Sequence, residues 1–281
     1  MKLKEKAMVK ALLMHFHQDQ SLLRFLPREH AKEIEALGIP QSLNFSTILN
    51  PKKWISTVHY SWFYPILKPL PQETQEHLLQ LFGSTQVKGL SAMLGVPLAE
   101  ERLSPFSLLY LSHYLRKKIE REEVLPLEIL PKSAMNPLIK VKWSDLILII
   151  DLLGLHDLAC DLKQIVDKKL LDRMYAAIPR EHRPFLEHAS KQPIKWVSPK
   201  LGLSGWDGEA KKLQAILHKR GLVRLTRGII DENLSFRWHL MHRFDVGRAK
   251  IMKRALGEPF DRTLISYFKS QILDIGKTVT K

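Results

Sequence analysis

One short element, an apolar residue followed by proline, any residue and glutamate, occurs four times and marks out helical segments along the chain. Its copies are Leu26-Pro27-Arg28-Glu29, Leu70-Pro71-Gln72-Glu73, Leu125-Pro126-Leu127-Glu128 and Ile178-Pro179-Arg180-Glu181. Proline suits the first position of a helix, because its missing N–H would be unpaired there and its fixed backbone angle fits. The glutamate falls in the first turn, where free amides and the helix dipole favour negative charge. We therefore predict that a helix begins at each proline.

Two copies of the element, residues 27–30 and 179–182, read PREH in full and raise the question of a repeated metal or acid–base site. The other two copies lack the histidine, so what recurs is the helix start. Neither Glu181-His182 nor Glu187-His188 has the spacing of the zinc-protease motif. We expect no metal, no cofactor and no catalytic residue; a site at a single copy is the alternative.

The spacing of apolar residues predicts helices over nearly the whole chain. In residues 104–120, Leu108, Leu111 and Leu115 fall on one face after the start signal Ser104-Pro105. A similar stripe runs through residues 155–177. Strand signals are sparse, the best being a hairpin over residues 222–230. The predicted class is an all-α globular protein with at most one short β-hairpin.

Composition indicates a globular chain without a membrane span. The 281 residues are 45% apolar, enough for a substantial core, and the single cysteine, Cys160, excludes an internal disulfide. The apolar stretch near the start is too short for a signal peptide, so we expect a retained amphipathic helix there. The longest apolar run falls far short of the roughly 20 residues that a membrane span needs. We expect a cytoplasmic protein.

Proline and glycine clusters predict the domain boundaries. Three prolines interrupt the helical pattern between Pro126 and Pro137, and three glycines follow two prolines between residues 192 and 208. The expected parts are an N-terminal helical region at 1–130, a linker at 131–142, a central helical region at 143–192, a loop at 193–208 and a basic C-terminal helical region at 209–281. Whether these parts are separate domains stays open.

Positive charge is concentrated near the C-terminus. Of the formal net charge of +15, residues 211–254 carry twelve Lys or Arg against three acids, a balance of 12 − 3 = +9. On a helical wheel, residues 234–256 form one apolar face and one basic face, the latter with His239, Arg243, Lys250 and Arg254. Such a field attracts nucleic acid, acidic lipid or an acidic protein. A solvated surface helix and a nucleic-acid interface are both alternatives at this point.

Two stretches resemble components of bacterial secretion machinery. Residues 167–179, followed by 181–186, resemble helical units of secretion and flagellar-switch proteins. The run Phe236-Arg237-Trp238-His239-Leu240-Met241, leading to Lys253-Arg254, resembles the carboxyl-terminal helix of the YscK-type (SctK) accessory proteins of type III secretion. As a whole the chain is similar to chlamydial secretion-apparatus proteins.

That resemblance implies a non-enzymatic cytoplasmic adaptor, peripheral to the inner membrane. Its partners would be the cytosolic domain of the membrane ring and subunits of the sorting platform. Aromatic and arginine side chains commonly anchor such interfaces. The expected partner-binding residues are Trp238, Arg243, Lys250 and Arg254, with Trp54, Trp62 and Tyr64 as a second patch. The competing hypotheses are a nucleic-acid-binding helical protein that uses residues 211–254 and, last, an enzyme without a familiar motif.

Overall fold

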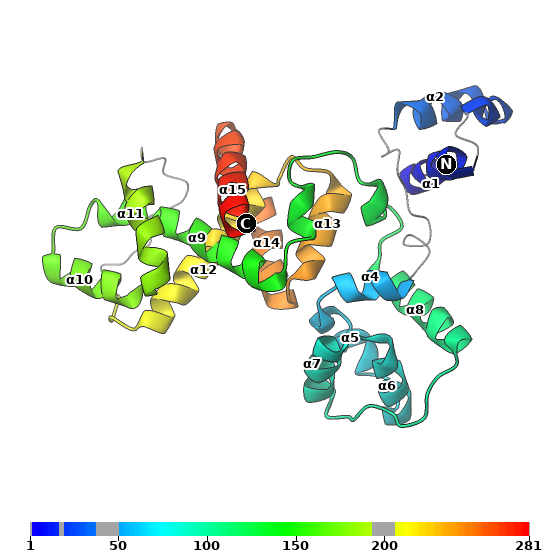
Figure 1. Cartoon of the computed structure of the whole chain (residues 1–281), viewed down its shortest axis with the longest axis horizontal. Helices are drawn as coiled ribbons and strands as arrows, with labels where there is room; N and C mark the ends of the chain where they lie inside the picture. The colour runs from blue at the N-terminus through cyan, green and yellow to red at the C-terminus, as the bar shows by residue number, and fades with distance from the viewer. Residues whose placement is uncertain (1, 17–19, 38–50, 193–205, 281) are drawn as a thin grey trace. The chain divides into compact units, whose positions relative to one another are not determined.

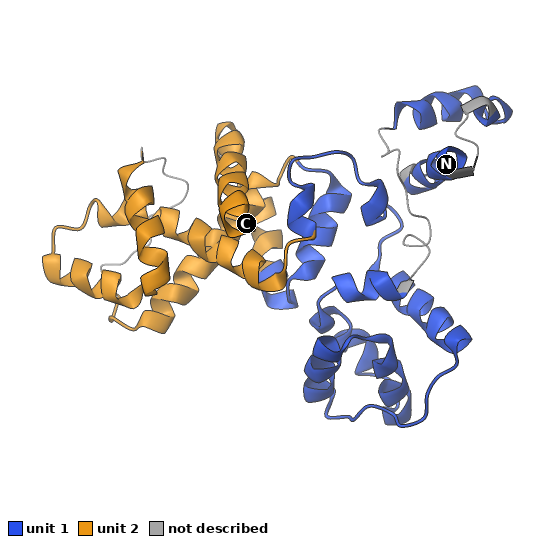
Figure 2. Ribbon diagram, in the orientation of Figure 1, with its two compact units in different colours: residues 1–139, 232–249 blue, residues 140–231, 250–281 orange. Residues whose placement is uncertain are grey.

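The computed structural model describes residues 2–16, 20–37, 51–192 and 206–280. Two compact units make up the chain (Figures 1 and 2). Unit 1 comprises Met1–Ile139 and Glu232–Ala249, and unit 2 comprises Lys140–Asp231 and Lys250–Lys281. Each unit is therefore assembled from two separate stretches of sequence.

Unit 1 contains short helices. Its α-helices are α1 (Leu3–Phe16), α2 (Arg28–Ala36), α4 (Pro51–Thr57), α5 (Tyr64–Leu67), α6 (Gln72–Leu78), α7 (Ser84–Leu94), α8 (Pro105–Ile119) and α13 (Leu234–Arg243). Its 3₁₀ turns are η1 (Gln20–Phe25), η2 (Tyr60–Trp62), η3 (Leu79–Leu81), η4 (Leu127–Ile129) and η5 (Asn136–Ile139).

Unit 2 contains the longest helices. Its α-helices are α9 (Trp143–Leu162), α10 (Lys168–Ala177), α11 (Arg183–Lys191), α12 (Ala210–Gly228) and α15 (Ile265–Val279), with the 3₁₀ turns η6 (Arg180–His182) and η8 (Arg262–Leu264). Helix α14 (Val246–Gly257) begins in unit 1 and ends in unit 2. No helix among the described residues is long and apolar enough to cross a membrane.

The all-α class is confirmed: the described residues form 14 α-helices and no strand. The expected hairpin over residues 222–230 is wrong, because Leu222 to Gly228 complete the last two turns of α12. The apolar residues there, among them Leu222 and Leu225, are three apart and face the core of unit 2. Helical spacing and burial outweigh the strand preference of the intervening β-branched residues.

A helix begins at all four copies of the proline element, one residue later than predicted. Pro27, Pro71, Pro126 and Pro179 are the N-cap residues of α2, α6, η4 and η6, with extended backbone angles (φ −50 to −56°, ψ 136 to 150°). Each proline carbonyl accepts the first hydrogen bond of its helix, at 2.9–3.1 Å. Each glutamate lies in the first turn, as predicted. The missing proline N–H costs nothing at this position, since the N-cap N–H lies outside the helical ladder.

Two stretches that were expected to be single helices are broken. Residues 155–177 contain the end of α9 and the whole of α10. The Asp167 side chain caps α10 by accepting from the amides of Lys169 and Leu170 at 2.9 and 3.3 Å. Residues 234–256 divide into α13 and α14 at Phe244, which has an extended backbone. The expected single basic face of that second stretch therefore does not exist.

Unit 1 has an aromatic core. Trp54, Phe63 and Phe82 pack with Leu and Val side chains from α6, α7 and α8, and Trp238 of α13 enters the same cluster. Helix α4 packs on α8. The stretch expected as a linker, residues 131–142, contributes Met135, Leu138 and Ile139 as buried side chains. Most of the loop expected at 193–208 lies outside the described residues.

Unit 2 is organised around a close approach of α9 and α12. A Cβ atom added to Gly221 of α12 would overlap the carbonyl oxygen of Ile150, and one added to Gly154 of α9 would overlap that of Leu217. The two backbones are therefore in direct contact at this crossing, and only glycine fits on either side. Helices α11 and α15 pack on α9 as well.

We predict that Gly221→Ala destabilises the protein by about 1–3 kcal/mol, because the methyl group forces α12 away from α9. The change can be measured as the free energy of unfolding in urea, followed by circular dichroism. Gly276→Ala in α15 is the matched control, since no atom lies within 4 Å of its added Cβ. It should be neutral or stabilising by up to about 1 kcal/mol. Equal stability of the two variants would contradict the close-contact description.

Candidate protein-docking surface

The tryptophans of the two predicted patches meet inside unit 1. The Trp238 ring stacks on Trp54 with centroids 6.4 Å apart and on His242 at 3.8 Å. His242 in turn lies 4.1 Å from the Trp62 ring. This set of four rings, which we call the aromatic stack, joins α4 and η2 to α13, more than 170 residues later in the chain. Its tryptophan–histidine contacts are packing interactions.

Polar groups of α13 complete the backbone hydrogen bonds of distant segments. The hydroxyl of Ser235 accepts from the amide of Leu125 at 2.9 Å, and the Nε2–H of His239 donates to the carbonyl of Leu125 at 2.8 Å. The Arg243 guanidinium donates to the carbonyls of Leu138 and Ile139 at 3.1 and 2.6 Å. Buried backbone groups need such partners, because an unpaired one costs about 1–3 kcal/mol.

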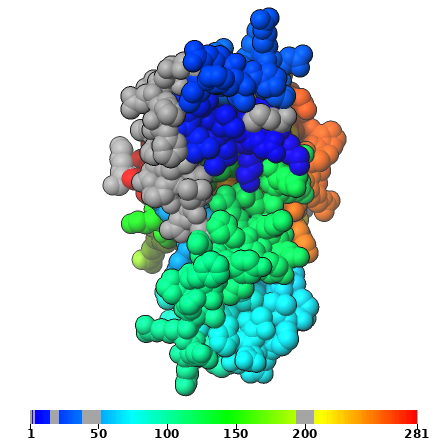
Figure 3. All heavy atoms as spheres, turned by 90° about the vertical axis from the view of Figure 1, so that its right-hand side faces the viewer, coloured from blue at the N-terminus to red at the C-terminus, as the bar shows by residue number. Residues whose placement is uncertain are grey.

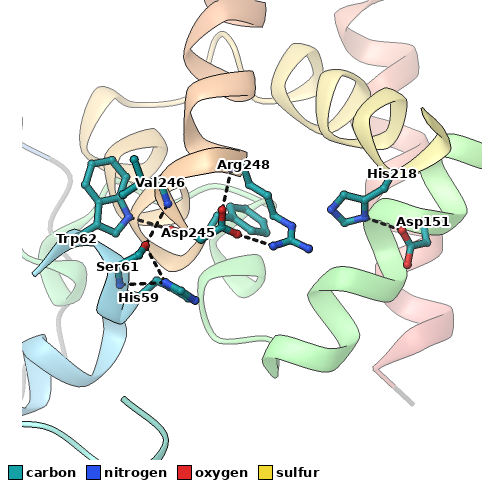
Figure 4. Close-up of polar contacts among 9 residues, drawn as sticks. His59, Ser61, Trp62, Asp151, His218, Asp245, Val246 and Arg248 are labelled. Carbon is teal, nitrogen blue, oxygen red and sulfur yellow. Dashed lines mark hydrogen bonds and ion pairs between the residues drawn. The ribbon is translucent and has the colours of Figure 1, made fainter. Parts of the chain in front are cut away.

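A second polar group lies where η2 meets the start of α14 (Figure 4). The Nδ1 atom of His59 accepts from the amide of Ser61 at 3.2 Å and lies 3.0 Å from its hydroxyl. The same hydroxyl accepts from the amide of Val246 at 3.1 Å, and Trp62 donates to the carbonyl of Phe244 at 2.8 Å. Because Nδ1 accepts an amide, the proton of neutral His59 is on Nε2.

This Ser–His contact works as a cap and not as a nucleophile pair. The Ser61 oxygen already accepts from Val246, and its proton points to His59. Asp245 caps α14 by accepting from the amide of Arg248 at 3.0 Å and also binds the Arg248 guanidinium. Burial lowers the pKa of His59, against the opposing pull of Asp245. Each of these polar groups has a partner that explains it structurally.

The structure places most of the predicted anchors away from solvent. Trp238 is 5% exposed and Trp54 is 7% exposed. Trp62 and Tyr64 are partly buried against the same core. Arg243 is held by two backbone carbonyls, and burial lowers its pKa. Only Lys250 and Arg254, both on α14, lie on the surface.

The basic segment also loses much of its surface charge to internal contacts. Arg224 is 1% exposed and binds Asp157 at 2.7 Å, and Arg220 binds the other oxygen of that carboxylate at 2.7 Å. Arg227 is buried over the Phe260 ring. The exposed cations of the segment, on α12 and α14, are Lys211, Lys212, Lys219, Lys250, Lys253 and Arg254. The positive surface charge of residues 211–254 is therefore weaker and less continuous than the sequence indicated.

Unit 2 contains buried and partly buried ionisable groups between its helices. Arg224 also donates to the amide oxygen of Gln271 at 2.7 Å, which links α12 to α15. His218 donates to Asp151 at 2.6 Å, and thus links α12 to α9 (Figure 4). Burial, aided by Arg224, lowers the pKa of His156 to about 3. These contacts are internal to the helix packing, and no group of three potential metal ligands occurs among the described residues.

The densest group of exposed large apolar side chains among the described residues lies on helix α8, of which sequence reasoning named only the face with Leu108, Leu111 and Leu115. Phe106 is 77% exposed, Leu109 48%, Tyr110 65% and Tyr114 40%. In Figure 3 the residues around 110 lie on the molecular surface turned to the viewer. These four residues, which we call the α8 stripe, are spaced 3, 1 and 4 apart. The signal was present in the sequence, because α8 is apolar on two opposite faces.

Comparison of the chain with protein-family models, with curated proteins and with solved structures gave no match. Function is therefore inferred from the surface and the packing of this chain alone, together with the sequence resemblance given above.

We predict that protonation of His239 destabilises the fold between pH 6.5 and pH 4. Burial lowers the pKa of His239 from 6.5 to about 4, opposed by its bond to Leu125. At pH 7 this histidine is mainly neutral in both the folded and the unfolded chain, so its protonation has little effect on the free energy of unfolding. As the pH falls below 6.5 the unfolded chain binds the proton first, so stability drops, by about 2 kcal/mol at pH 5 from this residue.

Urea unfolding at pH 7 and pH 5 measures this loss. His239→Gln retains an amide donor for Leu125 but cannot be protonated. The variant should therefore lose about 2 kcal/mol less unfolding free energy than the wild type between pH 7 and pH 5. His182→Gln, on η6, is the matched control and should leave the difference unchanged. An unaltered pH dependence in His239→Gln would contradict the assignment.

Proposed function

We propose that this chain is a non-enzymatic adaptor that works through protein–protein contacts in a bacterial type III secretion apparatus, where it links the membrane ring to the sorting platform. The observation that carries the proposal is the α8 stripe. Four of the eleven large apolar side chains that the described residues expose lie within nine residues of this helix. Contiguous exposed apolar surface of this kind marks interaction sites, whereas single exposed residues are ordinary.

The composition of the stripe supports a protein partner. Phe and Tyr side chains are enriched at protein interfaces, because they bury a large area with few rotatable bonds. The stripe lies on a helix whose other face is fixed in the core of unit 1 by Leu108, Leu111 and Leu115. A partner would therefore meet a rigid surface. The apparatus itself is proposed from the resemblance to SctK-type proteins and from nothing in the geometry.

The histidines and carboxylates support a structural role instead of catalysis. The polar groups around His59, His239 and Arg224 are all explained as caps or internal bridges. The alternative function, nucleic-acid binding through residues 211–254, rests on the exposed lysines of α12 and α14. Internal pairing of Arg220, Arg224 and Arg248 weakens that alternative.

We expect the tagged full-length chain to copurify with ring and sorting-platform subunits after mild crosslinking in its native cells. With the double variant Phe106→Ala/Tyr110→Ala, about tenfold less of these subunits should be recovered, which corresponds to a loss of ~1.4 kcal/mol of binding free energy. Both side chains are exposed, so the melting temperature should stay unchanged. Val166→Ala, at an exposed apolar residue of unit 2 outside the stripe, serves as the control and should keep normal recovery.

Recovery of no secretion subunit with the wild-type chain would overturn the proposal. Recovery of nucleic acid, with binding to random duplex DNA that falls steeply as salt rises, would favour the alternative.

A further inference from the structure

Helix α8 has one exposed face and one face that packs in the core of unit 1. At about 100° per residue, Phe106, Tyr110 and Lys117 lie within about 40° of one another on the helical wheel. Leu109 and Tyr114 flank them, whereas Leu108, Leu111 and Leu115 lie on the opposite side and pack in the core of unit 1. The α8 stripe therefore continues directly into a lysine at the C-terminal end of the helix.

Charge along this helix has one sign. Residues 105–119 contain no Asp or Glu, and the last turn holds Arg116, Lys117 and Lys118. Lys117 and Lys118 are exposed, and the Lys118 amine lies 5.4 Å from the centre of the Tyr114 ring. Among the described residues, no carboxylate lies within ion-pair distance of either lysine.

Two of the three acids that follow these lysines in sequence are bound to other cations of unit 1. Glu120 binds Arg116 at 2.9 Å and Lys4 at 3.1 Å, and Glu122 binds Lys2. The stripe thus ends in two exposed positive charges that form no ion pair among the described residues, and Glu122 acts on Lys117 only at longer range. A partner that covers the stripe must supply a negative charge, because burying a lysine unpaired is costly.

We propose that the α8 stripe binds the apolar face of an amphipathic, acidic helix of another protein, packed antiparallel to α8. This inference rests on the proposed adaptor function and adds the chemistry of the partner. An antiparallel helix places its N-terminal turn beside Lys117 and Lys118. Two effects favour acidic residues in that turn of the partner helix. One is attraction to Lys117 and Lys118, and the other is the dipole of the partner helix itself.

A cleft also opens near the N-terminal end of α8, on the side of Leu108. It has a volume of about 440 Å³ and is lined by Leu98, Leu103 and Leu108, with Glu100 and Arg102 among its polar residues. Leu98 is itself 48% exposed. None of the four stripe residues lines this cleft, and Leu108 belongs to the core-facing side of α8, so the cleft is separate from the stripe.

Two other occupants fit the surface less well. A second copy of the chain would pair α8 with α8, and in an antiparallel pair Lys117 and Lys118 would face residues 105–109, which carry no acid. A lipid surface would carry the Tyr110 hydroxyl, at the centre of the stripe, toward the acyl chains. A partner helix can leave the Tyr110 hydroxyl at the edge of the interface, where a polar group of the partner can bind it.

The proposal can be tested with two synthetic peptides of about five helical turns (~18 residues). One carries leucines on one face and glutamates in its first turn, and the other is identical except for lysines in place of the glutamates. Binding of each labelled peptide to the full-length chain is measured by fluorescence anisotropy at about 0.1 M salt, where charges more than ~10 Å apart are screened.

We expect the glutamate peptide to bind the wild-type chain and to bind Lys117→Glu/Lys118→Glu at least about tenfold more weakly. The lysine peptide should show the reverse preference. Binding of the lysine peptide to this variant also proves that the variant is folded. Phe106→Ala/Tyr110→Ala should lose both peptides, and Lys168→Glu/Lys169→Glu, at an exposed lysine pair on α10, should behave as the wild type does.

Equal binding of the two peptides, or binding that survives loss of both aromatic rings, would overturn the proposal. So would a stripe-dependent dimer in analytical ultracentrifugation, or stripe-dependent binding to vesicles of anionic phospholipid. These outcomes are distinguishable from failure of the adaptor function. If the peptides behave as expected but no secretion subunit copurifies, the surface chemistry stands and the apparatus is wrong.

Discussion

Unit 1 depends on helix α13, which supplies hydrogen bonds that three distant segments cannot make for themselves. The amide and carbonyl of Leu125 are satisfied by Ser235 and His239, and the carbonyls of Leu138 and Ile139 by Arg243. The amide of His59 donates to the carbonyl of His242 at 2.8 Å. Short helices leave many backbone groups unpaired at their ends, and unit 1 is built almost entirely of short helices. Without α13, these buried groups would have no partners.

This arrangement explains why residues that look like interface anchors are internal. Trp238 and Arg243 have the size, aromaticity and charge that interfaces use, but the same properties make them effective within a core of irregular backbone. Trp238 fills the space beside Trp54, and Arg243 binds two carbonyls at once. The core that Trp238 enters also contains Leu115 on the inner face of α8, and α8 packs on α4 and η3. The outer face of α8 therefore presents its aromatic rings away from this core.

The sequence predicted what is local and missed what depends on distant contacts. Pro71 and Glu73 mark a helix start because their effect acts within one turn, and Ser104 caps α8 for the same reason. The break at Phe244 was not predicted: Asp245 caps α14 locally, but the amide of Val246 is bound by Ser61, more than 180 residues away in the chain. The spacing of apolar residues also gave no indication that α13, which follows the helices of unit 2 in the sequence, packs in unit 1. The candidate site shows the same division: the sequence indicated the face of α8 with Leu108, Leu111 and Leu115, which is buried, but the exposed rings of the opposite face were recognised only in the structure.

Site-specific photocrosslinking in the native cells tests the central claim most directly. A photoreactive phenylalanine analogue in place of Tyr110 should crosslink to a single partner protein, and the linked peptide should contain an acidic amphipathic helix. The same analogue at Val166, which is 98% exposed on unit 2, should give no such product. Crosslinks from position 166 to a defined partner with none from position 110 would contradict the account. That outcome would assign docking to another surface of the molecule.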